Sequence, residues 1–316
     1  MVNQLKPIGF LFPGQGAQFV GMGKDLFEQS PAARELYEKA DSILGYPISQ
    51  ICFNGPESEL TRTLYAQTGI LVTSLAALAV LREKIHDLQP SLVAGLSLGE
   101  FTALTAAGAL SLEDALKLVQ IRSKAMENAA KNNPGTMASV MGLDLDQCKA
   151  VAQEAGCEIA NLNTPDQTVL SGTIPAIAQA CKIAEAKGAK RAMMLKVGGA
   201  FHSSLMGEAR VCLEAALAIT PIHEPQCAFI PNVTAQKISS PEEIRSLLAK
   251  QLTSPVQWVR TMATAKESGI MTYLEIGPGK ILKGLARKCR PELEVFSFGA
   301  MADIKGLGPL TSLAKS

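Results

Sequence analysis

The sequence predicts an α/β protein in which a mostly parallel sheet is interrupted by a smaller α/β unit. Most of the 316 residues alternate between short apolar runs that end in Gly- or Pro-rich turns and longer helical patterns, which is typical of a parallel sheet. One apolar run, residues 92–94, leads through a Gly-flanked serine directly into a helical pattern. Residues 132–197 have an order of strands and helices of their own, so we expect them to form an insert within a larger unit of residues 1–131 and 198–316.

The first strand is expected at Ile8 to Phe12, and it ends in the turn Pro13-Gly14-Gln15-Gly16. The glycines on either side of Gln15 let backbone N–H groups come close to a bound atom, although an ordinary βα turn is the alternative. Phe19 stands where a dinucleotide-binding loop needs its third glycine, so the pattern excludes that kind of loop. Two helices are expected next, one that begins at Ser30-Pro31 and a long buried one over residues 68–85.

The strand over residues 92–94 stops at Gly95-Leu96-Ser97-Leu98-Gly99. A strand, a GxSxG turn and a helix in this order form a nucleophile elbow, in which small residues on both sides of the serine let the two backbones approach. The Ser97 hydroxyl is then held clear of the sheet at a helix N-terminus, which favours developing negative charge. The alternative is a Gly-rich turn with a helix-capping serine. Because strand and helix patterns flank the motif, we favour a catalytic serine.

The helix that starts at Ser111-Leu-Glu-Asp114 carries an apolar stripe at helical spacing, and Arg122 falls within that stripe. An arginine that faces a core needs an anionic partner, which is either a ligand or a nearby carboxylate. A side chain that reaches solvent is a third alternative. The pattern alone favours the two structural alternatives over the ligand.

Residues 132–197 follow the break Asn132-Asn133-Pro134-Gly135. They predict strands at 136–142, 158–163, 168–172 and 191–197, with helices at 145–155 and 174–187. This is the β-α-β-β-α-β order of the ferredoxin-like arrangement. The junction between such an insert and the main sheet is a natural place for a cleft.

The main unit resumes at Gly198-Gly199. Its expected helices cover residues 200–219, 241–252, 256–266 and 280–290, and its expected strands cover residues 227–233, 271–276 and 293–298. Strands alternate with helices here as well, so we expect them to continue the parallel sheet.

A serine nucleophile needs a base, and the sequence contains three histidines. His202 follows the Gly-Gly hinge at the return from the insert, so it can face the cleft. His86 precedes the elbow strand and is expected near the opposite edge of the sheet, about 15–20 Å from Ser97 at ~3.3 Å per residue. His223 is expected in a loop. Asp166 would complete a Ser-Asp-His order, but it lies on a turn of the insert, so a backbone or side-chain carbonyl is the expected partner of the imidazole.

Composition and charge limit the classes of protein to which this chain can belong. The formal net charge is +1, so bulk electrostatics suggests neither nucleic acid nor an anionic membrane as a partner. The longest apolar pattern, residues 69–81, is too short to span a bilayer, and a strand that begins near Ile8 leaves no room for a targeting peptide. Seven cysteines without a CxxC pair indicate reduced thiols in a cytoplasmic protein and no metal site.

Six motifs together resemble one family over nearly the whole chain, the malonyl-CoA:acyl carrier protein transacylases. They are Phe12-Pro-Gly-Gln-Gly, Gly95-Leu-Ser-Leu-Gly-Glu, Gln120-Ile-Arg122, Gly199-Ala-Phe-His202, Ser254-Pro-Val-Gln-Trp258 and Glu275-Ile-Gly-Pro-Gly279. The resemblance implies an α/β-hydrolase-like large subdomain with an inserted ferredoxin-like small subdomain, which agrees with the order of elements above.

The resemblance also implies roles for single residues. Ser97 would be the nucleophile and His202 the base, with the backbone carbonyl of Gln257 orienting the imidazole. The backbone N–H groups of Gln15 and Leu98 would form the oxyanion hole. Arg122 would bind the free carboxylate of the malonyl group, and Asn163 and Phe201 would line the same cleft. Leu96 stands where many members of the family carry His, which affects the polarity of the cleft wall rather than the chemistry.

We therefore expect a malonyl group to pass from malonyl-CoA to the phosphopantetheine thiol of acyl carrier protein, in fatty acid synthesis, through a malonyl-Ser97 ester. A monomer without metal or cofactor suffices for this ping-pong reaction. The alternatives are a stand-alone acyltransferase of a polyketide synthase and a serine esterase or thioesterase, which would not need Arg122. Because carrier proteins are generally acidic, basic residues on the insert and on the last helix are candidates for docking: Lys190, Arg191, Lys283, Arg287 and Lys288.

Overall fold

The computed structural model of the chain describes residues 7–85 and 87–308. Its main sheet has five strands in the order β7-β2-β1-β8-β9, and every neighbouring pair is parallel. This confirms the mostly parallel sheet that the alternation of strands and helices predicts. The strands are β1 (Ile8–Phe12), β2 (Leu92–Gly95), β7 (Ala228–Ile230), β8 (Thr272–Ile276) and β9 (Glu294–Phe298).

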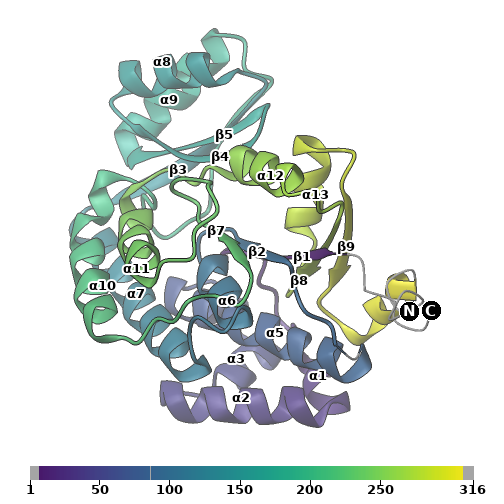
Figure 1. The fold of residues 1–316 in the computed structure, drawn as a ribbon. Coiled ribbons are helices and arrows are strands. Elements are labelled where there is room, and N and C mark those ends of the chain that lie inside the picture. The colour runs from purple at the N-terminus through teal and green to yellow at the C-terminus, as the bar shows by residue number, and fades with distance from the viewer. Residues whose placement is uncertain (1–6, 86, 309–316) are drawn as a thin grey trace.

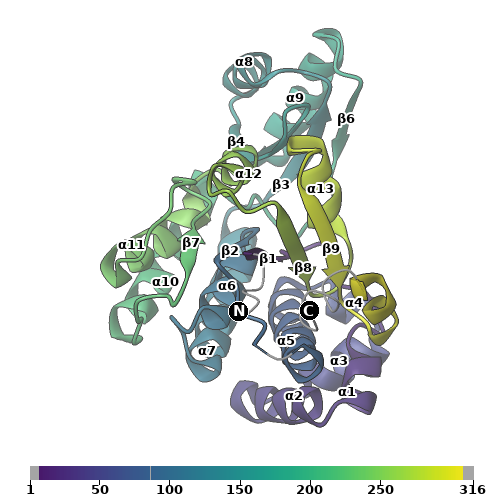
Figure 2. The same ribbon diagram turned by 45° about the vertical axis from the view of Figure 1, so that its right-hand side comes forward.

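Helices cover both faces of the main sheet (Figures 1 and 2). Alternate residues of β1 pack into different cores, with Phe10 and Phe12 on one side of the sheet and Leu11 on the other. Because both faces are buried, the strands are continuous apolar runs rather than alternating ones. Phe12 pairs with Gly95, so the turn after β1 and the elbow after β2 meet at the same edge of the sheet.

The helices of the main unit surround this sheet. They are α1 (Lys24–Gln29), α2 (Pro31–Leu44), α3 (Ile48–Asn54), α4 (Glu57–Leu60), α5 (Thr63–Lys84), α6 (Gly99–Ala106), α7 (Leu112–Asn132), α10 (Gly207–Ile219), α11 (Pro241–Lys250), α12 (Trp258–Glu267) and α13 (Ile281–Cys289), with 3-10 helices η1 (Ser204–Met206), η2 (Gln251–Thr253) and η3 (Met301–Leu307). The sequence did not predict α1, α3, α4 or η3. The first three have six, seven and four residues and no side-chain N-cap, so they carry neither a helical period nor a start signal.

Helix α5 is longer than the apolar pattern at residues 69–81 suggests. With 22 residues it is long and apolar enough to cross a membrane by length and composition alone. However, 89% of its most apolar window is buried inside the fold, against α2 and α7 among others. Such burial is typical of a core helix, and it explains why this helix is apolar on all sides.

The insert forms a second sheet with its own core. Its strands are β3 (Gly135–Met141), β4 (Glu158–Thr164), β5 (Gln167–Thr173) and β6 (Arg191–Met194), antiparallel in the order β4-β5-β3-β6. Helices α8 (Leu145–Ala155) and α9 (Ile174–Ala186) pack on this sheet, and together they bury a separate apolar cluster. The elements follow one another in the predicted order, and Figure 1 shows them as a lobe above the main sheet.

Strand β4 also joins the insert to the main unit. The Leu162 amide donates to the Val256 carbonyl at 2.9 Å, and the Val256 amide donates to the Ala160 carbonyl at 2.8 Å. These bonds form a parallel bridge between the end of β4 and the segment before α12. They hold the last residues of β4, including Asn161 and Asn163, beside the main unit.

The return from the insert differs from the prediction. Strand β6 ends at Met194 rather than at residue 197, and no helix begins at residue 200. Regular structure resumes only with η1 and α10. His202 therefore lies in an irregular turn with a φ of 59°, a left-handed backbone that a helix does not allow.

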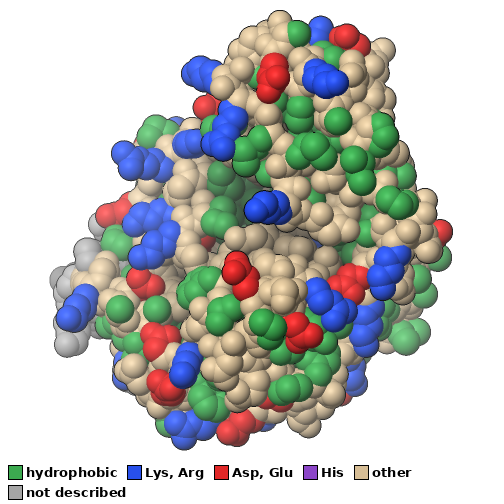
Figure 3. Space-filling view, turned by 180° about the vertical axis from the view of Figure 1, so that it is seen from behind, with side chains coloured by type: hydrophobic (Ala, Val, Ile, Leu, Met, Phe, Trp, Pro, Cys, Tyr) green, Lys and Arg blue, Asp and Glu red, His purple; other side chains and the backbone are tan. Residues whose placement is uncertain are grey.

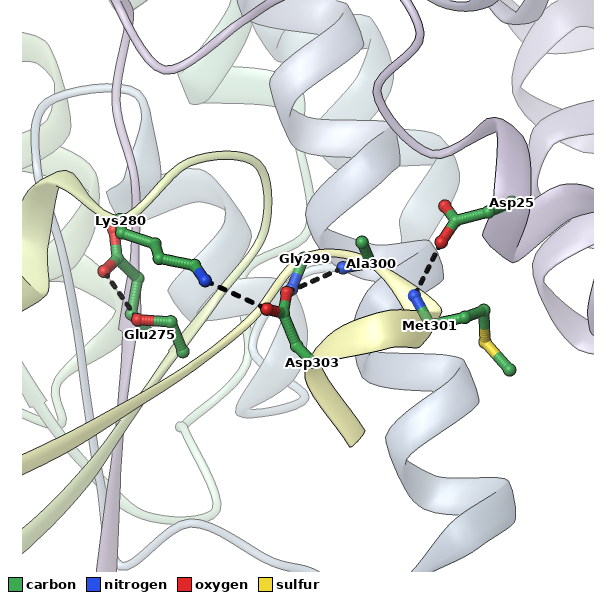
Figure 4. A network of polar contacts seen from close by, with 8 residues as sticks. Asp25, Glu275, Lys280, Gly299, Ala300, Met301 and Asp303 are labelled. Atoms are coloured by element: carbon green, nitrogen blue, oxygen red, sulfur yellow. Dashed lines mark hydrogen bonds and ion pairs between the residues drawn. The ribbon is translucent and has the colours of Figure 1, made fainter. Parts of the chain in front are cut away.

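The C-terminal segment is tied back to the first helices (Figure 4). The Asp303 carboxylate accepts from the backbone amides of Gly299 and Ala300 and pairs with Lys280 at 3.0 Å. The Met301 amide donates to Asp25 at 2.6 Å. These contacts fix the chain after β9 against α1, on the far side of the main sheet from the insert (Figure 1).

Candidate active site

The elbow after β2 has the backbone that its glycines predict. A Cβ on Gly95 would lie 2.0 Å from the Gly99 carbonyl carbon, and a Cβ on Gly99 would lie 2.1 Å from the Phe12 carbonyl oxygen. Only glycine fits at these two positions, because the strand, the helix and β1 all meet there. Ser97 has a φ of 53°, a conformation that costs a residue with a side chain about 1–3 kcal/mol. The fold therefore imposes a strained position on the serine.

Ser97 and His202 come together across this edge of the sheet. The Ser97 Oγ lies 2.9 Å from the His202 Nε2, although the two residues are 105 positions apart in the chain. Both side chains are buried. His202 also has a positive φ, so each member of the pair occupies a conformation that must be held by its surroundings.

The imidazole is oriented by a backbone carbonyl. His202 Nδ1 lies 2.9 Å from the carbonyl oxygen of Gln251, which can only accept, so Nδ1 carries the proton. Nε2 of the neutral ring then accepts the Ser97 hydroxyl proton. The prediction that Gln257 supplies this carbonyl is wrong. The Gln257 carbonyl accepts from the Thr261 amide at the start of α12, whereas Gln251 lies in the 3-10 turn η2.

His202 is a neutral base at ordinary pH. Burial, followed by the nearby positive charge of Arg122, lowers its pKa to about 4, against the hydrogen bonds from Nδ1 to backbone carbonyls. Of the other histidines, His223 is exposed in the loop before β7, and His86 lies outside the described residues. Asp166 is exposed and binds Thr164 at 2.6 Å, so it takes no part in orienting the imidazole.

Arg122 on α7 is fully buried next to the serine. Its Nη2 donates to Ser97 Oγ at 3.0 Å and to Gln251 Oε1 at 2.9 Å, and its Nη1 donates to Gln67 Oε1 at 2.5 Å. No carboxylate among the described residues forms an ion pair with it. Burial lowers its pKa to about 10, which leaves the guanidinium charged. The side chain therefore does not reach solvent, and it forms no direct ion pair; the nearby carboxylate of Glu100 acts on it electrostatically and through Gln251.

Two backbone amides stand near the serine without a protein acceptor in the described part of the chain. They belong to Gln15, in the turn after β1, and to Leu98, at the N-cap of α6. The Gln15 side chain accepts from Gln67 Nε2 at 3.2 Å, which connects this turn to α5. Such a pair of amides is the kind of donor set that stabilises an oxyanion.

A cleft of about 340 Å³ opens over Ser97 and His202 between the insert and the main sheet. Gln15, Gln67 and Leu96 line it from the main unit, and Asn163 and Val169 line it from the insert. Phe201 lies in its wall beside His202. The Asn163 Oδ1 is buried and has no partner among the described residues, so it can accept a hydrogen bond from a ligand. Figure 3 shows a hollow between the two lobes, with hydrophobic side chains within it and basic ones at its margin.

Three buried residues of the site were assigned no role from the sequence. Asn232, after β7, accepts from the Ser97 amide through Oδ1 at 2.6 Å and donates to the Gly95 carbonyl through Nδ2 at 2.7 Å. Gln251 connects His202, Arg122 and Ser97. Glu100, the last residue of the elbow motif, accepts hydrogen bonds from both Asn232 and Gln251. Each partner is far away in the chain, so no local pattern marks them.

The five candidate docking residues are all exposed, on β6, the turn before it and α13. Lys288 and Lys190 both lower the pKa of Asp166, after the hydrogen bond from Thr164, so these three charges lie near one another. No group of three or more His, Cys, Asp or Glu side chains in the described ranges is placed to hold a metal ion.

Comparison with known proteins gives one consistent result. Residues 9–292 match the family model of the acyl transferase domain. The malonyl CoA-acyl carrier protein transacylase of Bacillus subtilis is 41% identical over 298 residues, which cover 93% of each chain. The crystal structure of the acyl-carrier-protein-S-malonyltransferase of Bartonella henselae matches with a TM-score of 0.92 and 38% identity, over 96% of this chain and 99% of the other. A type II PKS acyl-carrier protein in complex with its malonyl-transacylase matches with a TM-score of 0.91 and 35% identity, over 98% of this chain and 100% of the other.

Proposed function

This chain belongs to the malonyl-CoA:acyl carrier protein transacylase family of acyl transferases, and on that premise we propose that it carries a malonyl group on Ser97 between malonyl-CoA and an acyl carrier protein thiol. The observation that carries the proposal is the Arg122 guanidinium, buried and 3.0 Å from the Ser97 hydroxyl. A buried cation that forms no direct ion pair with a carboxylate of the protein favours an acyl group that carries a carboxylate.

The first half-reaction forms the malonyl-serine ester. His202 Nε2 takes the proton from Ser97 Oγ, which attacks the thioester carbonyl carbon. The oxyanion receives hydrogen bonds from the backbone amides of Gln15 and Leu98. When the tetrahedral intermediate collapses, the carbon–sulfur bond breaks and the CoA sulfur takes the proton from His202. In the second half-reaction the carrier thiol gives its proton to His202 and attacks the ester carbonyl. The carbon–oxygen bond then breaks, and Ser97 Oγ takes the proton back from His202.

Arg122 selects the acyl group. A malonyl ester on Ser97 places its carboxylate two carbons from the ester carbonyl, within the neighbourhood of the guanidinium. The planar guanidinium can donate two parallel hydrogen bonds to this carboxylate, and Gln67 and Gln251 hold it beside Ser97. An esterase for uncharged acyl groups would leave this cation unpaired, so we favour malonyl transfer over hydrolysis.

The identity of the carrier protein decides whether the reaction serves fatty acid or polyketide synthesis. Relatives named for malonyl transfer to acyl carrier protein support fatty acid synthesis, and the complex with a type II PKS carrier supports polyketide synthesis as the second candidate. We assign carrier docking to the exposed basic residues of β6, the turn before it and α13. Asn163 and Phe201 line the path that the phosphopantetheine arm takes to Ser97.

The finer architecture is also part of the proposal. Residues 1–131 and 198–316 form an α/β-hydrolase-like subdomain, and residues 132–197 form a ferredoxin-like insert. The strand order β4-β5-β3-β6 supports the second assignment. We further propose a cytoplasmic monomer that needs no metal or cofactor and binds neither nucleic acid nor membrane.

Intact-protein mass spectrometry tests the proposal directly. After mixing with malonyl-CoA, the chain should gain one malonyl group, and peptide mapping should place it on Ser97. Ser97→Ala should remove the adduct, and added carrier protein with its phosphopantetheine arm should discharge it from the wild type. An adduct on any cysteine, or discharge to water at the same rate without carrier protein, would contradict malonyl transfer through Ser97.

A further inference from the structure

Glu100 is a buried carboxylate at the centre of the site that the reaction itself does not use. It lies in the first turn of α6 and is 1% exposed. Its Oε1 accepts from the Asn232 amide, and its Oε2 accepts from Gln251 Nε2 at 2.5 Å. No lysine, arginine or histidine in the described part of the chain pairs with it directly. A buried charge is unfavourable, so its position calls for a reason.

One of its oxygens acts on the elbow through Asn232. Glu100 holds the backbone amide of Asn232, and the side chain of Asn232 holds the Ser97 amide and the Gly95 carbonyl. Asn232 is fully buried, so these bonds have no competition from water. They maintain the left-handed backbone at Ser97, which is strained on its own.

The other oxygen acts on the base and on the arginine through Gln251. The Nε2 of Gln251 donates to Glu100 and, at 2.9 Å, to the Ser97 carbonyl, so this end of the amide faces two acceptors. The Oε1 must then face Arg122, and the backbone carbonyl of the same residue accepts from His202 Nδ1. The orientation of the Gln251 amide therefore depends on an acceptor at Glu100.

We propose that Glu100 is a positioning residue for malonyl transfer: its two carboxylate oxygens fix Asn232 and Gln251, and through them Ser97, His202 and Arg122 in one arrangement. The inference rests on the proposed function. A carboxylate suits this position because both of its oxygens accept. Burial raises the pKa of Glu100, but the two groups that face its oxygens, the Asn232 amide and Gln251 Nε2, can only donate, and together with the Arg122 charge they favour the ionised carboxylate.

Glu100→Gln is the sharpest test because it keeps the shape and removes one acceptor. The new NH₂ group must face either the Asn232 amide or Gln251 Nε2, and both are donors. If the Gln251 amide turns to relieve this contact, its own NH₂ group faces the Arg122 guanidinium. We expect kcat/KM for malonyl-CoA to fall roughly tenfold to a hundredfold, with a smaller loss for acetyl-CoA, because an unsatisfied buried donor is left next to Arg122. The ratio of the two kcat/KM values should fall.

Glu275→Gln is the matched control. Glu275 is also a fully buried glutamate of the main unit, and it accepts from the backbone amides of Leu282 and Lys283 at 2.9 Å. It has no bond to Asn232, Gln251 or Arg122. We expect Glu275→Gln to lower Tm without changing the ratio of kcat/KM for malonyl-CoA to kcat/KM for acetyl-CoA. Glu100→Asp, which keeps a carboxylate one methylene shorter, should retain more of the ratio than Glu100→Gln.

The outcomes separate the role of Glu100 from the proposed function. If the wild type forms no malonyl adduct on Ser97, the proposed function fails, whatever the variants do. If the wild type forms it but Glu100→Gln keeps the wild-type ratio, or loses malonyl and acetyl transfer equally with a fall in Tm like that of the control, the positioning role is overturned. Should Glu100→Gln fail to fold, the ratio measured on Glu100→Asp decides: a lowered ratio supports the role and an unchanged ratio overturns it.

Discussion

Two sets of charges in this molecule stand in opposite environments. Arg122 and Glu100 are buried under Ser97, and each is bound by polar groups from several elements. The basic residues of β6 and α13 are exposed, and no ion pair within residues 7–85 and 87–308 fixes them in one geometry. A buried charge is so unfavourable without partners that its position alone indicates a role, whereas exposed charges interact by about 0–1 kcal/mol per pair and are informative only as a group.

Arg122→Ala should have the largest effect on the buried side of this comparison. Removing one partner of a buried charge pair costs about 3–5 kcal/mol, and ~1.4 kcal/mol corresponds to a factor of ten. We therefore expect kcat/KM for malonyl-CoA to fall roughly a hundredfold to a few thousandfold, with a far smaller loss, or a gain, for acetyl-CoA. Arg122→Lys should recover only part of the malonyl preference, because an ammonium group cannot form two parallel hydrogen bonds.

Steady-state kinetics with both thioesters, alongside thermal unfolding, makes this measurement. An equal loss on malonyl-CoA and acetyl-CoA would mean that Arg122 supports the fold rather than selecting the acyl group. Arg122 would then resemble the exposed basic residues, because neither would have a specific ligand.

The pH dependence of acylation tests how the buried charges act on the base. His202 must be neutral to accept the serine proton, so activity is lost as pH falls through its folded pKa. That pKa is about 4, below the ordinary 6.5, so kcat/KM for acetyl-CoA should stay level down to about pH 5. In Arg122→Ala one of the two causes of the low pKa is gone, and the acid limb should move to higher pH. Burial, the larger cause, remains, so the limb should stay below 6.5.

Rapid-quench measurement of acetyl-Ser97 formation across pH 4 to 8 records this limb. The same limb position in the wild type and in Arg122→Ala would show that the guanidinium does not act on His202 electrostatically, despite its contact with Ser97.

Charge reversal on α13 should have the smallest effect, and only on one substrate. The double variant Arg287→Glu and Lys288→Glu should raise KM for carrier protein about three- to tenfold and leave KM for malonyl-CoA unchanged. The increase should shrink at high salt, because exposed charges are screened. Lys24→Glu with Lys39→Glu, exposed on α1 and α2 at the opposite end of the molecule (Figure 1), is the matched control. Equal changes for both substrates, or the same change in the control, would refute docking at α13.

The sequence predicts those parts of the site that depend on local spacing. Gly95 and Gly99 around Ser97 indicate the elbow, the Gly-Gly hinge places His202 at the junction, and Arg122 stands out as a charge in an apolar stripe. The residues that complete the site are uncharged or far away: Gln67 and Gln251 bind Arg122 from 55 and 129 positions along the chain. No periodicity encodes such contacts.

The wrong assignment of Gln257 has the same origin. Its motif marks the correct segment, but which carbonyl is available depends on where α12 begins and η2 ends. The short helices α1, α3 and α4 were missed because only packing against their neighbours stabilises them. The strands and most of the long helices, which carry strong periodic patterns, were predicted to within a few residues, but the helix expected from residue 200 begins only at Gly207.

The contact between Arg122 and the Ser97 hydroxyl has a consequence for how the enzyme handles unwanted thioesters. Arg122 Nη2 donates to the same oxygen that must attack the substrate. A malonyl carboxylate competes for this N–H and, by taking it, frees electron density on the hydroxyl. An acetyl group offers no such competitor, so it meets a serine whose nucleophilicity is still restrained. Binding of the acyl carboxylate and activation of the nucleophile are then one event.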